Sequence, residues 1–116
     1  MRQFCLFVLC SALFAACGQP KGKLLGKAPY GNTKSILAVQ AGDTPATVTL
    51  RGTLVEKCPV AGCWFRIQDD SGIIKVDTKA AGFVVTDVPL QTMVRVGGKV
   101  ATEGNETVLE ATGLRY

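Results

Sequence analysis

Two cysteines near the middle of the chain have the spacing of a thiol pair. Cys58 and Cys63 enclose four residues, among which Pro59 and Gly62 favour a tight turn. Such a turn can bring two cysteine Cα atoms within the roughly 4.4–6.8 Å that a disulfide needs. In an exported protein a pair of this kind most often forms a structural disulfide. The alternatives are a soft-metal site and a redox-active pair, and the spacing leaves all three open.

The rest of the sequence restricts the chemistry of these thiols. The chain has no histidine, which excludes Ser-His-Asp and Cys-His catalysis and any imidazole metal site. Zn²⁺ prefers four ligands, whereas two thiolates can hold Cu(I) at low coordination. Met93 is a candidate third ligand, although it lies far from the cysteines in the sequence. We therefore expect a binding or accessory module and no enzyme; the sequence establishes no cofactor and leaves Cu(I) open.

Aromatic and basic residues close to the thiol pair form a second candidate site. We expect Trp64, Arg66 and Lys75 on one outer face of the sheet, where the indole could stack on a ring or a sugar. Alternatively, Trp64 covers the end of the core beside the cysteines. The basic residues, with Arg51 and Arg95, could line an anion-binding face. The more usual role for such residues is to pair with acidic side chains on neighbouring strands.

Alternating apolar residues after about residue 47 predict five strands and almost no helix. The expected strands cover residues 47–54, 63–69, 73–77, 93–102 and 107–114. The first can coil sharply at Gly52, and the DDSG turn after residue 68 joins the second strand tightly to the third. The segment SILAVQ is open between a short strand and a helical turn. This pattern is typical of an all-β, five-stranded Greek-key barrel of the OB type, with an SH3-like barrel as the alternative.

The N-terminal residues have the pattern of an export signal. Met1 and Arg2 precede an almost wholly apolar run over residues 4–14, which is too short for a permanent membrane span. The run ends in LFAAC, which resembles the lipobox of bacterial lipoproteins. That resemblance implies removal of residues 1–16 and lipidation of Cys17, with palmitate or a similar acyl chain. The alternative is an ordinary cleaved signal with a coincidental cysteine.

These features divide the chain into a signal peptide (1–16), a lipidated cysteine with a flexible tether (17–35) and one barrel domain (36–116). The tether contains Lys21, Lys23, Lys27 and Lys34. The remaining charges nearly cancel, which argues against nucleic acid as a partner. We expect the membrane as a partner through the lipid anchor, together with an envelope protein. Because Gly18 follows Cys17, the lipoprotein resemblance favours the outer membrane of the cell envelope, on its periplasmic side.

The segment CPVAGCWF also resembles the Cys-x-x-x-Gly-Cys-Trp motif of a family of small exported bacterial OB-fold proteins of unknown function. The resemblance covers roughly residues 50–116 and implies the fold and the exported location more firmly than an activity. Many members have methionine directly after the tryptophan, where this chain has Phe65, and this difference weakens a thioether-assisted copper site. The matching positions are Cys58, Gly62, Cys63, Trp64 and the pair Gly82-Phe83.

Two functions from different classes follow. The first is a non-enzymatic envelope lipoprotein that handles Cu(I) or thiol redox chemistry through Cys58 and Cys63. The second is a ligand- or protein-interaction barrel that uses Trp64 and the outer sheet face. In the second case the cysteines form only a structural disulfide.

Overall fold

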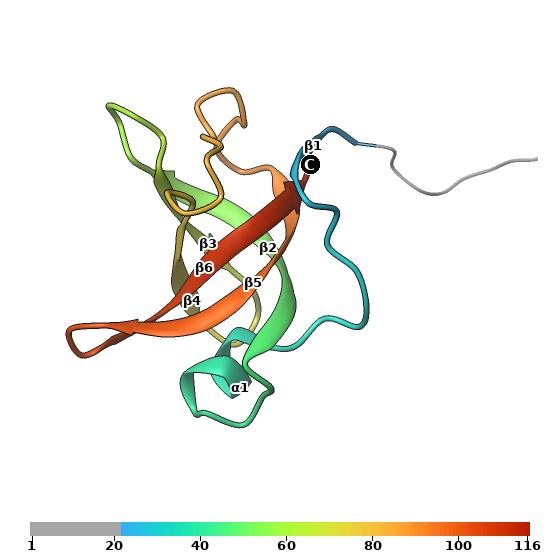
Figure 1. Cartoon of the computed structure of the whole chain (residues 1–116), viewed down its shortest axis with the longest axis vertical. Coiled ribbons are helices and arrows are strands. Elements are labelled where there is room, and N and C mark those ends of the chain that lie inside the picture. The colour runs from blue at the N-terminus through green and yellow to red at the C-terminus, as the bar shows by residue number, and fades with distance from the viewer. Residues whose placement is uncertain (1–21) are drawn as a thin grey trace, which may run out of the picture.

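Five strands close into a barrel in the computed structural model, which describes residues 22–116 (Figure 1). The order around the barrel is β2-β3-β4-β6-β5, and β5 pairs with β2 to close it. All of these pairings are antiparallel except β4 with β6. The strands are β2 (Thr47–Lys57), β3 (Trp64–Gln68), β4 (Ile73–Asp77), β5 (Met93–Glu103) and β6 (Glu106–Arg115). This arrangement confirms the predicted all-β barrel of the OB type.

The core forms from the inward side of each strand, as the alternation predicts. Leu50 and Leu54 on β2 and Phe65 on β3 are fully buried. Gly52 lies where β2 leaves β5 and begins to pair with β3. A Cβ on Gly52 would lie 2.7 Å from the carbonyl oxygen of Gln68, so only glycine lets the two strands approach this closely.

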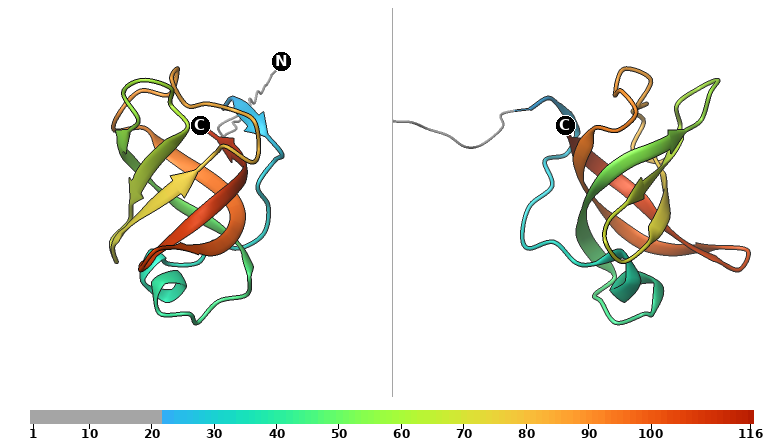
Figure 2. Two further views of the ribbon diagram at one scale, coloured as in Figure 1. Left: turned by 60° about the vertical axis from the view of Figure 1, so that its left-hand side comes forward. Right: turned by 180° about the vertical axis from the view of Figure 1, so that it is seen from behind.

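One short helix, α1 (Ile36–Gln40), lies at the end of the barrel opposite the connection between β2 and β3 (Figure 2). Ser35 caps it, because its hydroxyl accepts a hydrogen bond from the backbone N–H of Ala38. The turn between β3 and β4 also holds the helix, since Asp69 Oδ2 accepts from the N–H of Ile36 at 2.9 Å. The DDSG segment is therefore a structural turn. Of the two alternatives for SILAVQ, a short strand or a helical turn, the structure has the helical turn.

The N-terminal part of the described chain runs along the outside of the barrel. β1 (Leu24–Gly26) pairs with the last residues of β6. Further along, the N–H of Lys34 donates to the carbonyl of Thr49, and the Thr49 hydroxyl donates to the carbonyl of Tyr30 at 2.6 Å. Residues 22–35 thus lie against the barrel, and for these residues this corrects the expectation of a flexible tether over 17–35. The contacts are mainly to backbone groups, which composition does not reveal.

Residues 1–21 lie outside the described part of the chain, and so do the expected signal peptide and the Cys17 lipidation site. Between residues 22 and 116, no helix is long and apolar enough to cross a membrane.

Candidate functional site

The connection between β2 and β3, residues 58–63, carries both cysteines and is called the thiol loop here. Cys58 and Cys63 are free thiols, and both are half-buried. The backbone N–H of Cys58 donates to the carbonyl of Trp64 at 3.0 Å, which closes the base of the loop. The loop thus presents two thiols at one end of the barrel, as the spacing predicts.

The thiol loop is fixed by the long connection between β4 and β5. The carbonyl of Gly62 accepts from the N–H of Val85 at 2.9 Å, and the carbonyl of Cys63 accepts from the N–H of Thr78 at 2.9 Å. Gly62 has a φ of +64°, and a Cβ there would lie 2.7 Å from Thr86 Cγ2. Glycine is required at this position both by the left-handed backbone and by the close packing.

Lys57, which directly precedes the thiol loop, holds the facing segment in place. Its Nζ donates to the carbonyl oxygens of Val88 at 2.6 Å and Thr86 at 3.1 Å. By donating to these backbone carbonyls, Lys57 links the end of β2 to the segment around residues 86–88, which is far away in the sequence. Nothing in the sequence motif distinguishes this lysine from a solvated one.

The Cys58 thiol lies against the turn that follows it. Hydrogen bonds from the backbone N–H groups of Ala61, Val60 and Gly62 lower the pKa of Cys58 from 9.0 to about 7. About half of the Cys58 side chains are therefore thiolate near neutral pH. The thiolate is the form of cysteine that binds metals and attacks disulfides, so the turn prepares Cys58 for either chemistry.

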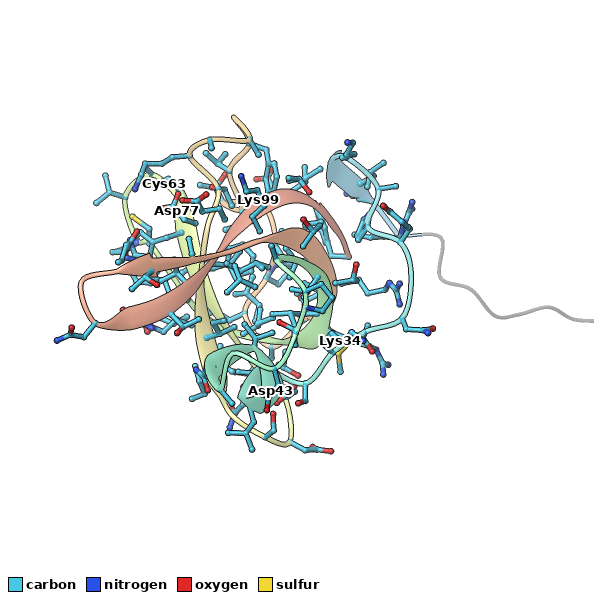
Figure 3. The ribbon with its side chains drawn as sticks, turned by 60° about the horizontal axis from the view of Figure 1, so that its bottom comes forward. Lys34, Asp43, Cys63, Asp77 and Lys99 are labelled. Carbon is cyan, nitrogen blue, oxygen red and sulfur yellow. The ribbon has the colours of Figure 1, made fainter. Side chains whose placement is uncertain are left out.

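A charged pair lies beside the second cysteine, and Figure 3 shows Asp77 next to Cys63. Asp77 Oδ2 lies 3.0 Å from Lys79 Nζ. Burial raises the pKa of Asp77, but hydrogen bonds and charge from Lys79 outweigh it, so the pKa lies below its ordinary value. The pKa of Lys79 is raised, chiefly by its hydrogen bond to Asp77 and also by the charge of Cys63. A cation thus stands within electrostatic reach of Cys63, a feature that the sequence analysis missed.

Trp64, Arg66 and Lys75 lie together on the outer face of β3 and β4, and this group is called the tryptophan face. Lys75 Nζ lies 5.6 Å and Arg66 Cζ 5.8 Å from the centroid of the Trp64 ring, within the range of cation–π attraction. Trp64 is half-buried between these two cations. Its neighbour Phe65 projects to the opposite side and is fully buried.

The cations of the tryptophan face are already paired with acidic residues. Arg66 forms ion pairs with Glu106 at 2.9 Å and Glu56 at 3.2 Å, and Lys75 pairs with Glu103 at 3.0 Å. This is the ordinary pairing that the sequence analysis weighed against an anion-binding face. Three carboxylates thus outnumber the two cations of the tryptophan face, which is better suited to a neutral ring than to an anion.

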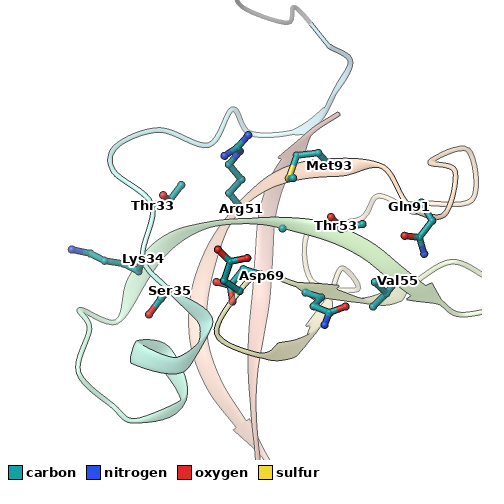
Figure 4. A pocket seen from close by; sticks show the side chains of 12 residues that line it. Thr33, Lys34, Ser35, Arg51, Thr53, Val55, Asp69, Gln91 and Met93 are labelled. Carbon is teal, nitrogen blue, oxygen red and sulfur yellow. The ribbon is translucent and has the colours of Figure 1, made fainter.

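Met93 does not join the cysteines. It lines a hollow of about 700 Å³ on the outer side of β2, together with Arg51, Thr53 and Gln91 (Figure 4). Neither Cys58 nor Cys63 lines this hollow. Over residues 22–116, no three Cys, Asp or Glu side chains gather in a way that could hold a metal ion. Any metal at the thiol loop would therefore rely on the two thiols.

Comparison with known proteins identifies the class of barrel. Residues 21–115 match the family described as bacterial OB fold (BOF) protein. The chain belongs to this family. Among solved structures, this BOF chain is similar to the hypothetical protein ygiW from E. coli, with 23% identity and a TM-score of 0.57 over 73% of this chain and 89% of that one. At this identity the likeness supports the fold alone. No curated protein sequence matches the chain.

Proposed function

We propose that this BOF protein is a non-enzymatic envelope lipoprotein that handles Cu(I) through Cys58 and Cys63. The observation that carries the proposal is the thiol loop itself. Two free, half-buried thiols share a loop that is fixed by Val85 and Thr78, and the turn after Cys58 stabilises its thiolate. Two thiolates on a preformed loop suit a soft ion.

The ligand set favours Cu(I) over Zn²⁺. Zn²⁺ is usually held by four protein ligands in structural sites and by three in catalytic sites, and the described residues offer no third Cys, Asp or Glu in a suitable group. Cu(I) is soft and is satisfied by thiolate sulfur at low coordination. Lys79 adds a positive charge near Cys63, on the same side of the loop as its ion-pair partner Asp77.

The spacing of the two cysteines also permits a disulfide, in which neither sulfur is free to bind metal. Thiol–disulfide exchange with a disulfide of another protein would thus oxidise the pair, reduce that disulfide to two thiols and release Cu(I), and exchange with a dithiol would restore the site. This reversible behaviour requires that the fold does not depend on the disulfide. The barrel core and the bonds from Gly62 and Cys63 to the facing loop do not involve the sulfur atoms, in agreement with this requirement.

The envelope location rests on the LFAAC segment, in which Cys17 would become the lipidated N-terminus, and on Gly18, which favours the outer membrane. Intact-mass measurement of the protein from the membrane fraction tests this part. We expect a chain that begins at Cys17 with acyl mass added. A lipid-free chain that begins elsewhere would contradict it.

Titration of the reduced chain with Cu(I) in the presence of a chromophoric Cu(I) chelator tests the metal site. We expect one Cu(I) per chain, a much lower affinity in Cys58→Ser and in Cys63→Ser, and wild-type affinity in the control Met93→Leu. Mild reductant should open an oxidised pair without unfolding the barrel. If reduction unfolds the barrel, or if Cys58→Ser binds as tightly as the wild type, the cysteines are structural.

The tryptophan face is a second candidate function, because two cations hold the Trp64 ring on the outside of the sheet. Both cations are already paired with carboxylates, which favours a neutral cyclic ligand such as a sugar that would stack on the indole. Trp64 is the only tryptophan of the chain, so its fluorescence reports on this face directly. A panel of neutral oligosaccharides that leaves the emission unchanged would remove this candidate.

A further inference from the structure

Three arginines from three different strands stand in one row on the barrel surface. Arg95 on β5 pairs in register with Arg51 on β2 on one side and with Arg115 on β6 on the other. Residues directly opposite each other on neighbouring strands project from the same face of the sheet. The adjacent residues Leu50 and Leu114 are buried, so this arginine row faces outward.

The arginine row has no carboxylate partner within residues 22–116. In that range the four ion pairs involve only Arg66, Lys75 and Lys79 as cations. Arg95 donates one hydrogen bond, at 2.8 Å, to the carbonyl of Gly31, and a guanidinium has five N–H donors. Like charges that lie directly opposite each other destabilise a sheet. A row of three such charges is therefore expected to have an external anion as its partner.

The surface around the row combines charge with apolar side chains. A hollow of about 250 Å³ is lined by all three arginines together with Met93 and Tyr116. Met93 is 49% exposed and lies beside Arg51 (Figure 4), and Leu24 on β1, opposite Arg115, is 42% exposed. Guanidinium groups bind phosphate oxygens, whereas exposed apolar side chains suit the boundary between headgroups and acyl chains. This combination fits a phospholipid surface better than a soluble anion.

The chain path brings the row close to the expected anchor. Gly22, the first described residue, itself lines the hollow. Cys17 precedes it by five residues, which span at most about 18 Å when fully extended. A lipid on Cys17 would therefore hold the membrane surface near this side of the barrel.

We propose that Arg51, Arg95 and Arg115 dock the barrel on the anionic phospholipid headgroups of the membrane that holds the lipid anchor. This inference rests on the proposed anchorage at Cys17 and adds an orientation to it. The thiol loop and the C-terminal end of β6 lie at the same end of the barrel but on opposite sides of it (Figures 1 and 2). Docking through the arginine row consequently turns Cys58 and Cys63 away from the membrane and leaves them accessible.

Vesicle binding by a chain without lipid measures the contribution of the arginine row to membrane binding separately from that of the lipid anchor. The test protein is the mature chain, residues 17–116, with Cys17→Ser; it keeps every element that the structure describes. We expect it to sediment with vesicles of phosphatidylglycerol and phosphatidylethanolamine but not with phosphatidylcholine, and to be released at high salt. Each arginine near an anionic surface contributes about fivefold to binding, so the Arg51→Gln, Arg95→Gln, Arg115→Gln triple variant should bind roughly 100-fold more weakly.

Arg66→Gln is the matched control, since Arg66 lies on the tryptophan face and is already paired. It should bind anionic vesicles as the parent chain does. Arg51 is the most exposed member of the row, and the single exchange Arg51→Gln should lower the affinity for anionic vesicles about fivefold. This single variant replaces the triple variant in the test if the triple variant does not melt cooperatively. Wild-type binding by both row variants would overturn the proposal, as would loss of binding only when the four N-terminal lysines are replaced. A chain isolated from cells without lipid would contradict the proposed anchorage at Cys17 and not the binding of vesicles by the row. The vesicle result is also independent of Cu(I) binding.

Discussion

The carbonyl oxygen of Gly62 accepts a hydrogen bond of 2.9 Å from the backbone N–H of Val85. This single bond joins the thiol loop to a segment more than twenty residues away and orders the turn whose N–H groups face the Cys58 sulfur. The reactivity of Cys58 is thus a property of the barrel end as a whole. Substitutions that disturb the packing of Gly62 should change both the stability of the barrel and the thiol.

Gly62→Ala should destabilise the barrel by about 2–3 kcal/mol. A left-handed φ costs an L-residue about 1–2 kcal/mol, and the new Cβ would also meet Thr86 Cγ2 at 2.7 Å. Gly104→Ala is the matched control, because Gly104 has a φ of +62° but open space around it. Gly104→Ala should lower the free energy of unfolding only by the amount that the left-handed φ costs. Equal losses for the two variants in urea unfolding would contradict the packing account.

Thr78→Val should stabilise the barrel by about 1 kcal/mol. Thr78 is fully buried, and its Oγ1 has no hydrogen-bond partner among the described residues. Valine has a similar shape and removes a polar group that is buried without compensation. Thr49→Val makes the comparison, because the Thr49 hydroxyl donates to Tyr30 at 2.6 Å and its loss should cost about 1 kcal/mol. Thermal melts that move both variants in the same direction would refute this assignment.

The reactivity of Cys58 should follow a pKa of about 7. In a Cys63→Ser chain, the rate of alkylation by iodoacetamide should rise with pH and reach half its maximum near pH 7, about two units below the ordinary value of 9.0. A half-maximal rate near pH 9 would show that the backbone N–H groups do not stabilise the thiolate.

The stability of the reduced protein should depend on pH in the same window. Cys58 loses its proton near pH 7 in the folded state and near pH 9 in the unfolded state, so between these values the unfolded chain binds more protons. The free energy of unfolding should therefore rise from pH 7 to pH 9. Cys58→Ser should show a smaller rise over this range, and urea titrations at several pH values measure the difference.

The barrel strands could be predicted from the sequence because each depends on a local alternation. The segment from Ile73 to Asp77, for example, has its predicted bounds, and Phe65 and Ile67 are buried as expected. β1 was missed because Leu24–Gly26 is short and binds the end of β6 through its backbone. No pattern within a short sequence window reports such pairing.

The candidate site was only partly predictable for a related reason. Cys58, Cys63 and Trp64 are close in the sequence, and Lys75 follows from the register of one tight hairpin. Lys57 and Lys79 gain their roles from a loop conformation that the sequence does not specify. The arginine row joins residues up to 64 positions apart, from Arg51 to Arg115, and is visible only once the register of β2, β5 and β6 is known.

X-ray absorption at the copper edge tests the central claim most directly, because it counts the atoms bound to the metal. For the reduced chain loaded with one Cu(I), we predict a shell of two sulfur atoms and no nitrogen, and loss of one sulfur in both Cys58→Ser and Cys63→Ser. An unchanged sulfur shell in either variant, or copper bound only to light atoms in the wild type, would contradict metal handling by the thiol loop.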